Sequence, residues 1–594
     1  MIRALIIAAL LAATTACSGG HSAPATDVIV QTESGRTAGS ASENGVLRWL
    51  DIPYAQPPVG DLRWRAPQQL AASDDLLAVA DEPLLCPQQS GETSGIVDAG
   101  LIGSEDCLYL DIAAPADFRS GNYPVMFWIH GGGNNSGHKG TYDFSALVER
   151  ENVVVVTINY RLGPLGWFVH PSLTNDAGEL DASGNFGTLD IIAALRWTQR
   201  NIAAFGGDPQ NVTIFGESAG GQNVLTVLAS PTTEGLFHKA IAQSPVLQSY
   251  SLAQAFNEEK VFPYVDRGSW EIVEALGLDN GAVTADRLRN ATAEEVLAAY
   301  YGIPRDHASP LVIGDGVVIP EEGLMAALGN ARVAKDVPVM VGSNRDEVTL
   351  WLGLSRYFVN ADDVLFGLLP PKLRVKDPAV FNYWVEQRGR GWKVRGVDEP
   401  INAMRLAGYE DLYAYRFDWD EQDDNWFVRF SSLLGAAHAS EIAFVMGAPM
   451  YGSVGDYMYP DTESAQAMTD IMMGAWANFA REGAPGNING IAWPQFSAQS
   501  PDVMVLDAGA EQPRVLQDSP GLDGLLNEVA AASSALNSKE TCMLVWELVT
   551  TIGEPSYDRY EAWNDGACAS VDVPQEKATI RASLEAEYGS ADVF

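Results

Sequence analysis

Four short apolar runs between residues 125 and 242 constrain the fold of this chain more than any other feature. They are Val125–Ile129, Val153–Ile158, Val212–Phe215 and Ala240–Ala242, and each is apolar nearly throughout rather than at alternate positions. Strands without a polar face are buried on both sides, which is typical of parallel sheets covered by helices. Asp190–Phe205 shows helical periodicity between two of these runs. The sequence therefore predicts an α/β fold with a central, mostly parallel sheet flanked by helices.

The pattern continues toward the C-terminus. Two longer, mixed stretches, 246–335 and 348–430, predict helical insertions above the sheet. The last residues, about 537–594, are more polar and predict an appendage. Later core elements are predicted as strands at 337–341 and 412–417 and a helix at 468–481, whose Met and aromatic residues fit a core.

The amino-acid composition and net charge exclude some fold types and some classes of partner. Of 594 residues, 47% are hydrophobic, which supports a large core and excludes disorder, collagen or coiled coil as the main architecture. Lys and Arg number 37 against 77 Asp and Glu, a net charge of −40. Nucleic-acid binding requires cations against phosphate, so a nucleic-acid partner is not expected. The acidity favours solubility, with steering of cationic substrates as the alternative.

Residues 1–16 combine a basic start with a short apolar stretch, which is typical of a secretory signal peptide. Two cleavage sites compete. Cys17 can be a lipidated first residue followed by a small-residue linker, 17–27, which would tether the protein to a membrane. Ordinary cleavage near Ala16 or Ala23 would instead release a soluble protein. We favour lipidation, and in both cases we expect export, as a periplasmic or outer-membrane lipoprotein or a secreted protein.

Four cysteines remain besides Cys17. Their even number fits an exported protein with disulfides. Proximity in the sequence suggests the pairs Cys86–Cys107 and Cys542–Cys568. No CxxC spacing is present, so we expect no zinc site.

The sharpest motif is Gly216–Gly220, which reads G-E-S-A-G and directly follows the strand Val212–Phe215. A G-x-S-x-G string between a strand and a helix forms a tight turn that exposes the serine hydroxyl. Small flanking residues avoid clashes in that turn. Ser218 would also lie at a helix N-terminus, where developing negative charge is favoured. The motif predicts Ser218 as a nucleophile.

A serine hydroxyl needs an adjacent base, and the expected chain order in such a fold is serine, acid, histidine. Three histidines follow Ser218. His238 falls in a predicted helix too close to the serine, and His307 precedes the best acid candidates. His438 lies in the small-residue loop Gly435–Glu441, where an imidazole could reach the serine. His438 is therefore the predicted base.

The acid and the oxyanion donors follow two other strands. Glu347 and Asp346 both come after the strand at 337–341, and the residues alone do not separate them. Either would fix the imidazole tautomer and stabilise its charged form. The string Trp128–Gly133 ends in His-Gly-Gly-Gly, whose backbone N–H groups can approach a substrate oxygen.

Together these strings resemble the type-B carboxylesterase family, which includes the cholinesterases. The likeness covers roughly residues 28–500, and implies one α/β-hydrolase catalytic domain over residues 28–594 with a deep gorge formed by the insertions. The matching strings are Ser104–Asp111, Asn159–Gly166, Gly184–Asp190, Asn201–Pro209, Val212–Gly220, Asn344–Glu347, Gly435–Glu441, Trp476–Ala480 and Trp493–Pro494.

The resemblance also implies roles for individual residues. It implies the triad Ser218, Glu347 and His438, and so favours Glu347 over Asp346. It implies an oxyanion hole from the N–H groups of Gly132, Gly133 and Ala219, with Glu217 as an electrostatic neighbour. It supports the Cys86–Cys107 disulfide and implies the structural ion pairs Arg63–Glu105 and Arg161–Asp190.

Two departures from the family bear on the substrate. The loop between Cys86 and Cys107 has no aromatic residue, whereas cholinesterase-like enzymes place a tryptophan there to hold a quaternary ammonium group. A choline-ester specialist is therefore not expected. Asn134 follows the three glycines where the family often has an aromatic residue, and predicts a more polar pocket wall.

The sequence thus predicts an exported serine carboxylesterase that acts on a small-molecule ester and needs no cofactor and no metal. A lipase, an amidase or a detoxifying esterase for a bulky substrate is the alternative. A non-catalytic binding protein on the same scaffold is disfavoured because all three triad residues are present. The natural ester and the oligomeric state are not set by the sequence.

Overall fold

A computed structural model describes residues 28–42, 44–91, 94–175, 177–262, 265–304, 309, 311–365, 369–450, 454–497, 501–532 and 536–593. The predicted signal peptide (1–16), the linker 17–27 with Cys17, and His307 lie outside these residues. Within them, no helix combines the length and the apolar character that a membrane span requires.

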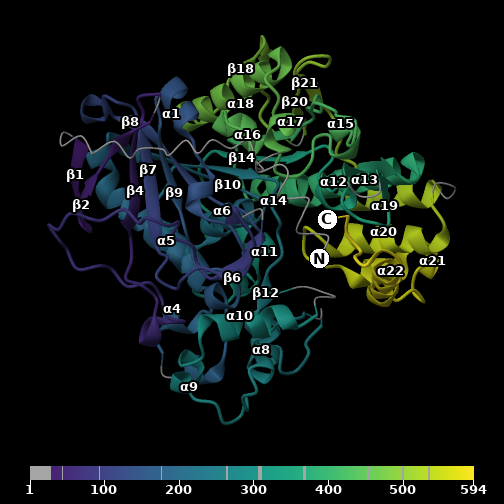
Figure 1. Cartoon of the computed structure of the whole chain (residues 1–594), viewed down its shortest axis with the longest axis horizontal. Coiled ribbons are helices and arrows are strands. Elements are labelled where there is room, and N and C mark those ends of the chain that lie inside the picture. The colour runs from purple at the N-terminus through teal and green to yellow at the C-terminus, as the bar shows by residue number, and fades with distance from the viewer. Residues whose placement is uncertain are drawn as a thin grey trace.

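An eleven-stranded sheet forms the centre of the molecule (Figure 1). Neighbours are parallel from β20 through β9, and antiparallel at both ends. The prediction of an α/β-hydrolase fold with a mostly parallel sheet is confirmed. The strands, in spatial order, are β21 (Arg514–Leu516), β20 (Val503–Leu506), β17 (Leu412–Phe417), β14 (Val339–Asn344), β11 (Lys239–Gln243), β10 (Gly207–Glu217), β8 (Tyr123–Ile129), β9 (Val154–Ile158), β7 (Tyr109–Ala114), β4 (Leu47–Pro53) and β3 (Ser40–Ala41).

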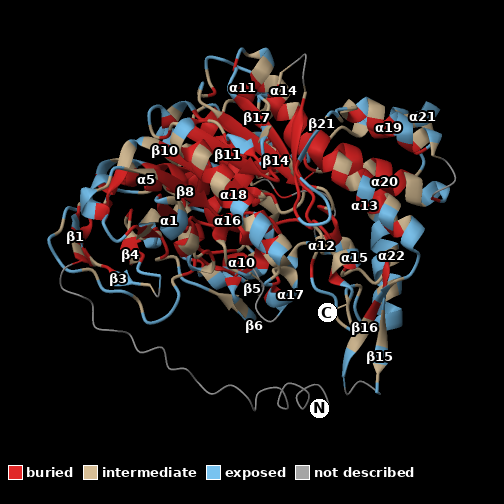
Figure 2. Ribbon diagram, turned by 90° about the horizontal axis from the view of Figure 1, so that it is seen from above, coloured by how far each residue is buried: buried red, intermediate tan, exposed pale blue. Residues whose placement is uncertain are grey.

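Two hydrophobic cores cover the two faces of this sheet (Figure 2). In β8, Phe127 and Ile129 pack on one face, and Met126 and Trp128 on the other. This alternation explains the uninterrupted apolar runs, because both faces are buried. The first face carries α5 (Phe186–Asn201) and α6 (Ala219–Ala229); the second carries α1 (Ser145–Glu151), α16 (Ile442–Met446) and α18 (Glu463–Glu482).

The stretch 246–335 contains short helices, as predicted, and one short strand pair. The helices are α7 (Leu252–Phe256), α8 (Ser269–Ala275), α9 (Ala285–Arg289), α10 (Ala293–Gly302) and α11 (Leu324–Leu328), and the parallel strands are β12 (Tyr250–Ser251) and β13 (Ile313–Gly314).

For the stretch 348–430 the prediction of a helical insertion is partly wrong. The antiparallel hairpin β15 (Val359–Val364) and β16 (Leu369–Val375) precedes its long helix. Pro370 and Pro371 in β16 lack N–H groups, so they are excluded from a helix interior and tolerated in a two-stranded edge. The helical part comprises α12 (Thr349–Leu352), α13 (Pro378–Trp392), the π-helical segment η10 (Lys393–Asp398) and α14 (Glu399–Leu406).

His238 is also placed differently from its prediction. It lies immediately before β11 rather than in a helix, and its Nδ1 accepts a hydrogen bond of 3.1 Å from the N–H of Val212. The segment that follows pairs with β10 on one side and β14 on the other. This burial between two strands outweighs the local helical pattern.

The C-terminal region is helical and begins at residue 521, before the predicted appendage. It packs against α13 and forms a third core with it (Figure 1). The structure joins Cys542 to Cys568 within this region, and Cys86 to Cys107 near the sheet. Its helices are α19 (Gly521–Ala531), α20 (Ser538–Thr550), α21 (Tyr557–Gly566) and α22 (Val573–Tyr588).

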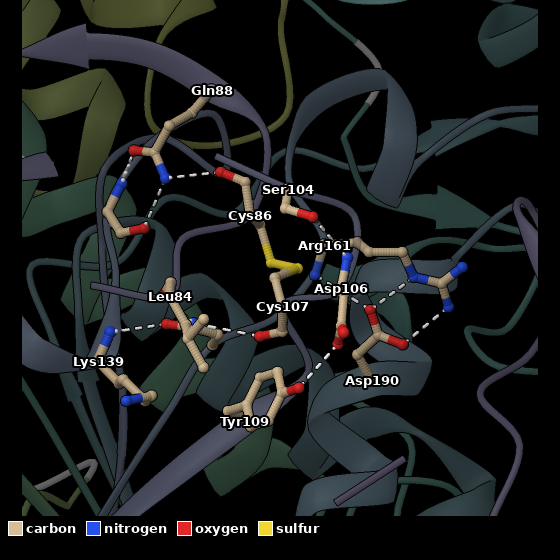
Figure 3. The surroundings of a disulfide bond; sticks show 12 residues. Leu84, Cys86, Gln88, Ser104, Asp106, Cys107, Tyr109, Lys139, Arg161 and Asp190 are labelled. Carbon is tan, nitrogen blue, oxygen red and sulfur yellow. Dashed lines mark hydrogen bonds and ion pairs between the residues drawn. A yellow bond between two sulfur atoms is a disulfide. The ribbon is translucent and has the colours of Figure 1, made fainter. Parts of the chain in front are cut away.

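Both ion pairs implied by the family resemblance are present. Arg63 Nε donates to Glu105 Oε1 at 2.6 Å. Arg161 Nε and Nη2 each donate to an Asp190 oxygen at 2.7 Å, and this pair is fully buried (Figure 3). Burial raises the pKa of Asp190, and the Arg161 guanidinium opposes that effect.

Arg161→Met should leave the Asp190 carboxylate buried without its cation, and lower the free energy of unfolding by about 3–5 kcal/mol. Urea denaturation measures this loss. The matched control is Arg374→Met, because Arg374 pairs with Asp362 while 64% of its side chain is exposed. That variant should lose less than about 1 kcal/mol. Equal losses in the two variants would contradict a structural role for the buried Arg161–Asp190 pair.

Candidate functional site

Ser218 lies on the turn predicted for it. β10 ends at Glu217 and α6 begins at Ala219, so Ser218 alone connects strand and helix, with φ 60° and ψ −120°. Such a backbone conformation is costly for a residue other than glycine, and persists only where the surroundings impose it. The turn presents a half-buried serine at the carboxyl end of the central strand.

His438 and Glu347 meet beside this turn. His438 Nδ1 lies 2.6 Å from Glu347 Oε2, and both side chains are buried. The other carboxylate oxygen, Oε1, accepts the N–H of Asn344 at 2.8 Å. Asp346 points elsewhere: its Oδ2 accepts the N–H of Ala436 at 3.0 Å and pairs with Arg345. The structure thus brings Glu347, and not Asp346, to the imidazole.

The other imidazole nitrogen faces Glu217. His438 Nε2 lies 3.1 Å from Glu217 Oε1, and the described residues show no hydrogen bond between Nε2 and the Ser218 hydroxyl. Burial opposes charge on His438, but the carboxylates of Glu217 and Glu347 outweigh it and raise the pKa of His438 to about 9. Burial raises the pKa of Glu217 to about 8. Both groups therefore hold a proton to higher pH than they would in water.

A third buried carboxylate, which sequence reasoning missed, completes this cluster. Glu441 accepts hydrogen bonds from Asn344 Nδ2 at 2.6 Å and from Gln243 Nε2 at 3.0 Å. Burial raises the pKa of Glu441. Trp476 Nε1 donates to the Gln243 amide oxygen at 3.0 Å and fixes its orientation. Glu441 is the last residue of the string Gly435–Glu441, which also contains His438. Its place in that string was the sequence signal that could have identified it.

The glycine loop after β8 lies against the serine turn. A side chain at Gly131 would lie within 3.3 Å of Ser218 Cβ and 2.9 Å of Glu217 Oε2, so no side chain fits there. Gly132 and Gly133 have φ +89° and +63°. Among the described residues, their N–H groups and that of Ala219 donate to no protein acceptor. They are available to a ligand oxygen.

Asn134 does not form the polar pocket wall that its position suggested. It is 1% exposed, and its Oδ1 accepts a hydrogen bond of 2.8 Å from Asn223 Nδ2 on α6. Tyr160 OH also reaches this oxygen, at 3.3 Å. A positive φ of 57° turns the side chain into the core, where it ties the glycine loop to α6. The polar side chain of Asn134 therefore makes hydrogen bonds within the fold.

Two tryptophans that the sequence did not single out lie against the imidazole. The ring centroids of Trp351 and Trp392 lie 5.1 Å and 4.8 Å from that of His438. The two indoles stack on each other, with an interplanar angle of 10°. Trp351, four residues after Glu347, is 49% exposed, whereas Trp392 at the end of α13 is buried. No local pattern marked Trp392.

The described residues contain no group of three or more His, Cys, Asp or Glu side chains placed to hold a metal ion. The groups gathered at this site are the Ser218 hydroxyl on its turn, the His438 imidazole and three buried carboxylates.

A profile of the carboxylesterase family matches residues 26–362 and 398–519. The chain belongs to the carboxylesterase family. It is 34% identical over 499 residues to the para-nitrobenzyl esterase of Bacillus subtilis, covering 81% of this chain and 95% of that protein. It is 34% identical over 502 residues to the fumonisin B1 esterase of Sphingopyxis macrogoltabida, covering 79% of this chain and 84% of that protein.

Comparison with solved structures points to the same family. A thermophilic PNB esterase superimposes with a TM-score of 0.64 at 29% identity, covering 82% of this chain and 97% of that one. A Geobacillus stearothermophilus carboxylesterase gives a TM-score of 0.62 at 30% identity, covering 83% and 98%. The protein is thus a carboxylic-ester hydrolase of the serine type, as predicted.

Glu217→Gln in this esterase should move the acidic limb of kcat/KM to lower pH. Losing the carboxylate beside Nε2 lowers the pKa of His438 from about 9, so a neutral imidazole persists at lower pH. The measurement is the pH profile on p-nitrophenyl acetate. The control is Asp523→Asn, a carboxylate whose side chain is 80% exposed. A limb that stays in place or moves to higher pH would contradict this assignment.

Proposed function

We propose that Ser218, His438 and Glu347 form the catalytic triad of this esterase, and that it cleaves esters through an acyl-enzyme. The observation that carries the proposal is the 2.6 Å contact between His438 Nδ1 and Glu347, buried beside a serine on a strained strand-to-helix turn. Glu347 holds the imidazole in the tautomer that leaves Nε2 free to accept a proton.

In the first half-reaction, Ser218 Oγ attacks the ester carbonyl and His438 Nε2 takes its proton. The carbonyl electron pair moves to oxygen, and the N–H groups of Gly132, Gly133 and Ala219 stabilise the charge. The carbonyl re-forms as the bond to the alcohol oxygen breaks, and His438 protonates the leaving alcohol. Water then repeats the sequence on the acyl-serine and releases the acid.

In this scheme Glu217 raises the pKa of the base, His438. Its carboxylate competes with Ser218 for Nε2 in the resting state, because Oε1 already lies 3.1 Å from that nitrogen. A substrate that enters the site must therefore displace this contact before Ser218 can pass its proton to His438. Glu217 also stabilises the imidazolium that forms in each half-reaction.

Small soluble esters are the proposed substrate class. The half-exposed Trp351 beside His438 offers an apolar surface to the group attached to the carbonyl.

The first test is a rate profile on p-nitrophenyl esters of increasing acyl length, with Ser218→Ala as the blank. Acetate and butyrate should be cleaved fastest, with rates falling by octanoate. Ser218→Ala should lower kcat by about 10⁴-fold or more and abolish labelling by a fluorophosphonate. Labelling of the variant would refute the nucleophile. Interfacial activation on long chains would indicate a lipase instead, and anilide cleavage at comparable rates an amidase.

The acid is tested by a pair of neighbouring variants. Glu347→Gln should lower kcat by about 10³–10⁴-fold, since the amide no longer orients and stabilises the charged imidazole. Asp346→Asn should leave kcat nearly unchanged, because Asp346 binds Arg345 and the N–H of Ala436. The reverse ranking in steady-state kinetics would transfer the acid role to Asp346.

We further propose that the esterase is exported and tethered by a lipid on Cys17, as residues 1–27 suggest. Expression of the full chain in a bacterial host should place activity in the membrane fraction. Cys17→Ala should move that activity to the soluble periplasmic or secreted fraction without lowering kcat. Activity that is soluble in both forms would favour ordinary cleavage near Ala16 or Ala23.

A further inference from the structure

The glycine loop supplies two of the proposed oxyanion donors. It is hydrogen-bonded by the buried side-chain amide of Gln88, a residue outside the loop. Gln88 is 0% exposed and begins β5 (Gln88–Gly91), two residues after Cys86. Its Nε2 donates to the carbonyl of Cys86 at 3.0 Å and to that of Gly137 at 3.1 Å. Its Oε1 accepts the N–H of Gly137 at 2.8 Å. The amide thus binds both backbone groups of one residue (Figure 3).

Gly137 is the point at which the glycine loop closes. Its φ is +111°, and a side chain there would lie 2.6 Å from His130 Nδ1 and 3.2 Å from the Gly131 carbonyl. The N–H groups of Asn135 and Ser136 both donate to the Gly132 carbonyl at 3.1 Å. Residues 131–137 are therefore one compact turn, in which the position of Gly137 sets that of Gly132.

A second side-chain amide, that of Asn159, binds the chain two residues after Gly137 and lies next to Cys107. Asn159 Oδ1 accepts the N–H of Lys139 at 2.8 Å, and its Nδ2 donates to the carbonyls of Leu84 at 2.7 Å and Cys107 at 3.1 Å. The Cys86–Cys107 disulfide joins the two anchoring points covalently. Figure 3 shows Gln88, Lys139 and the disulfide in this arrangement.

We propose that Gln88 is a positioning residue for the oxyanion donors. By holding Gly137 it keeps the turn 131–137 closed and the N–H groups of Gly132 and Gly133 aimed at the reacting carbonyl. The inference rests on the oxyanion role proposed above for these two glycines. Without the amide, the buried N–H and carbonyl of Gly137 lose their partners, and the turn opens to recover hydrogen bonds. Donors that move away from the oxyanion stabilise the transition state less, while the rest of the pocket still binds the ligand.

Three variants test this role. Gln88→Met has a similar shape and removes all three hydrogen bonds. Gln88→Glu keeps an acceptor for the Gly137 N–H but turns its second oxygen toward the carbonyls of Cys86 and Gly137, so its effect should be at least as large. Asn185→Leu is the matched control. Asn185 is 0% exposed and makes the same two-point bridge to another backbone residue, Ile313, at 2.7 Å and 3.1 Å.

Two ligands separate transition-state from ground-state binding. A trifluoromethyl ketone analogue of the best ester accepts Ser218 Oγ at its carbonyl carbon; the serine proton passes to His438, and the carbonyl electron pair becomes an oxyanion. The corresponding secondary alcohol has the same shape but cannot form this adduct. Inhibition constants for both are measured beside kcat/KM and the melting temperature.

In Gln88→Met, kcat/KM should fall by about 10²-fold, the loss typical of one oxyanion donor. The ketone inhibition constant should rise by a similar factor while that of the alcohol stays unchanged. Asn185→Leu should lower the melting temperature without changing either constant. A wild-type ketone constant in Gln88→Met, or an equal kinetic loss in Asn185→Leu, would overturn this inference alone. A wild-type enzyme that forms no adduct would overturn the triad, and this inference with it.

Discussion

The site depends on a close approach of two backbones with no side chain between them. A side chain at Gly216 would lie 2.5 Å from the carbonyl oxygen of Ile129 at the end of β8, and one at Gly220 would overlap the same atom. Gly131, two residues after Ile129, faces the serine turn, and a side chain there would collide with Glu217 and Ser218. Because these glycines let β8 and the β10–α6 turn touch, the proposed nucleophile and the proposed backbone donors lie close together. Any larger residue would separate them.

The second constraint is electrostatic. Glu217, Glu347 and Glu441 are all buried around one imidazole, and no arginine or lysine is paired with them among the described residues. Three carboxylates in a water-poor interior are unfavourable unless some are protonated or compensated. The raised pKa values of Glu217 and Glu441 show the first solution, and the raised pKa of His438 shows the second. In the triad proposed above, the positive charge that forms on the imidazole is therefore stabilised before a substrate arrives.

The sheet and the serine turn could be predicted because they follow from local patterns: apolar runs without a polar face, and a glycine-flanked serine at a strand end. The choice between Asp346 and Glu347 could not be made from local patterns, since both follow the same strand and only the fold shows that Asp346 turns to Arg345. Glu441, Trp351 and Trp392 were missed because their function depends on contacts across the chain. The hairpin β15–β16 departs from the predicted helical insertion because Pro370 and Pro371 are excluded from a helix interior. The prediction that Asn134 lines the pocket rests on the family position after the three glycines, whereas its positive φ turns it into the core.

One part of the chain that the family profile does not match reaches the candidate site. Residues 363–397 and 520–594 fall outside the matched ranges, and they pack on each other in the third core. Trp392 belongs to this core and also contacts His438, and Val348, next to Glu347, packs in it as well. Arg395 in η10 donates to the carbonyls of Leu548 and Thr551, which fixes the π-helical segment to the end of α20. Trp392 thus brings a segment outside the family profile against His438, whereas Glu217, Glu347 and Trp351 lie inside the profile.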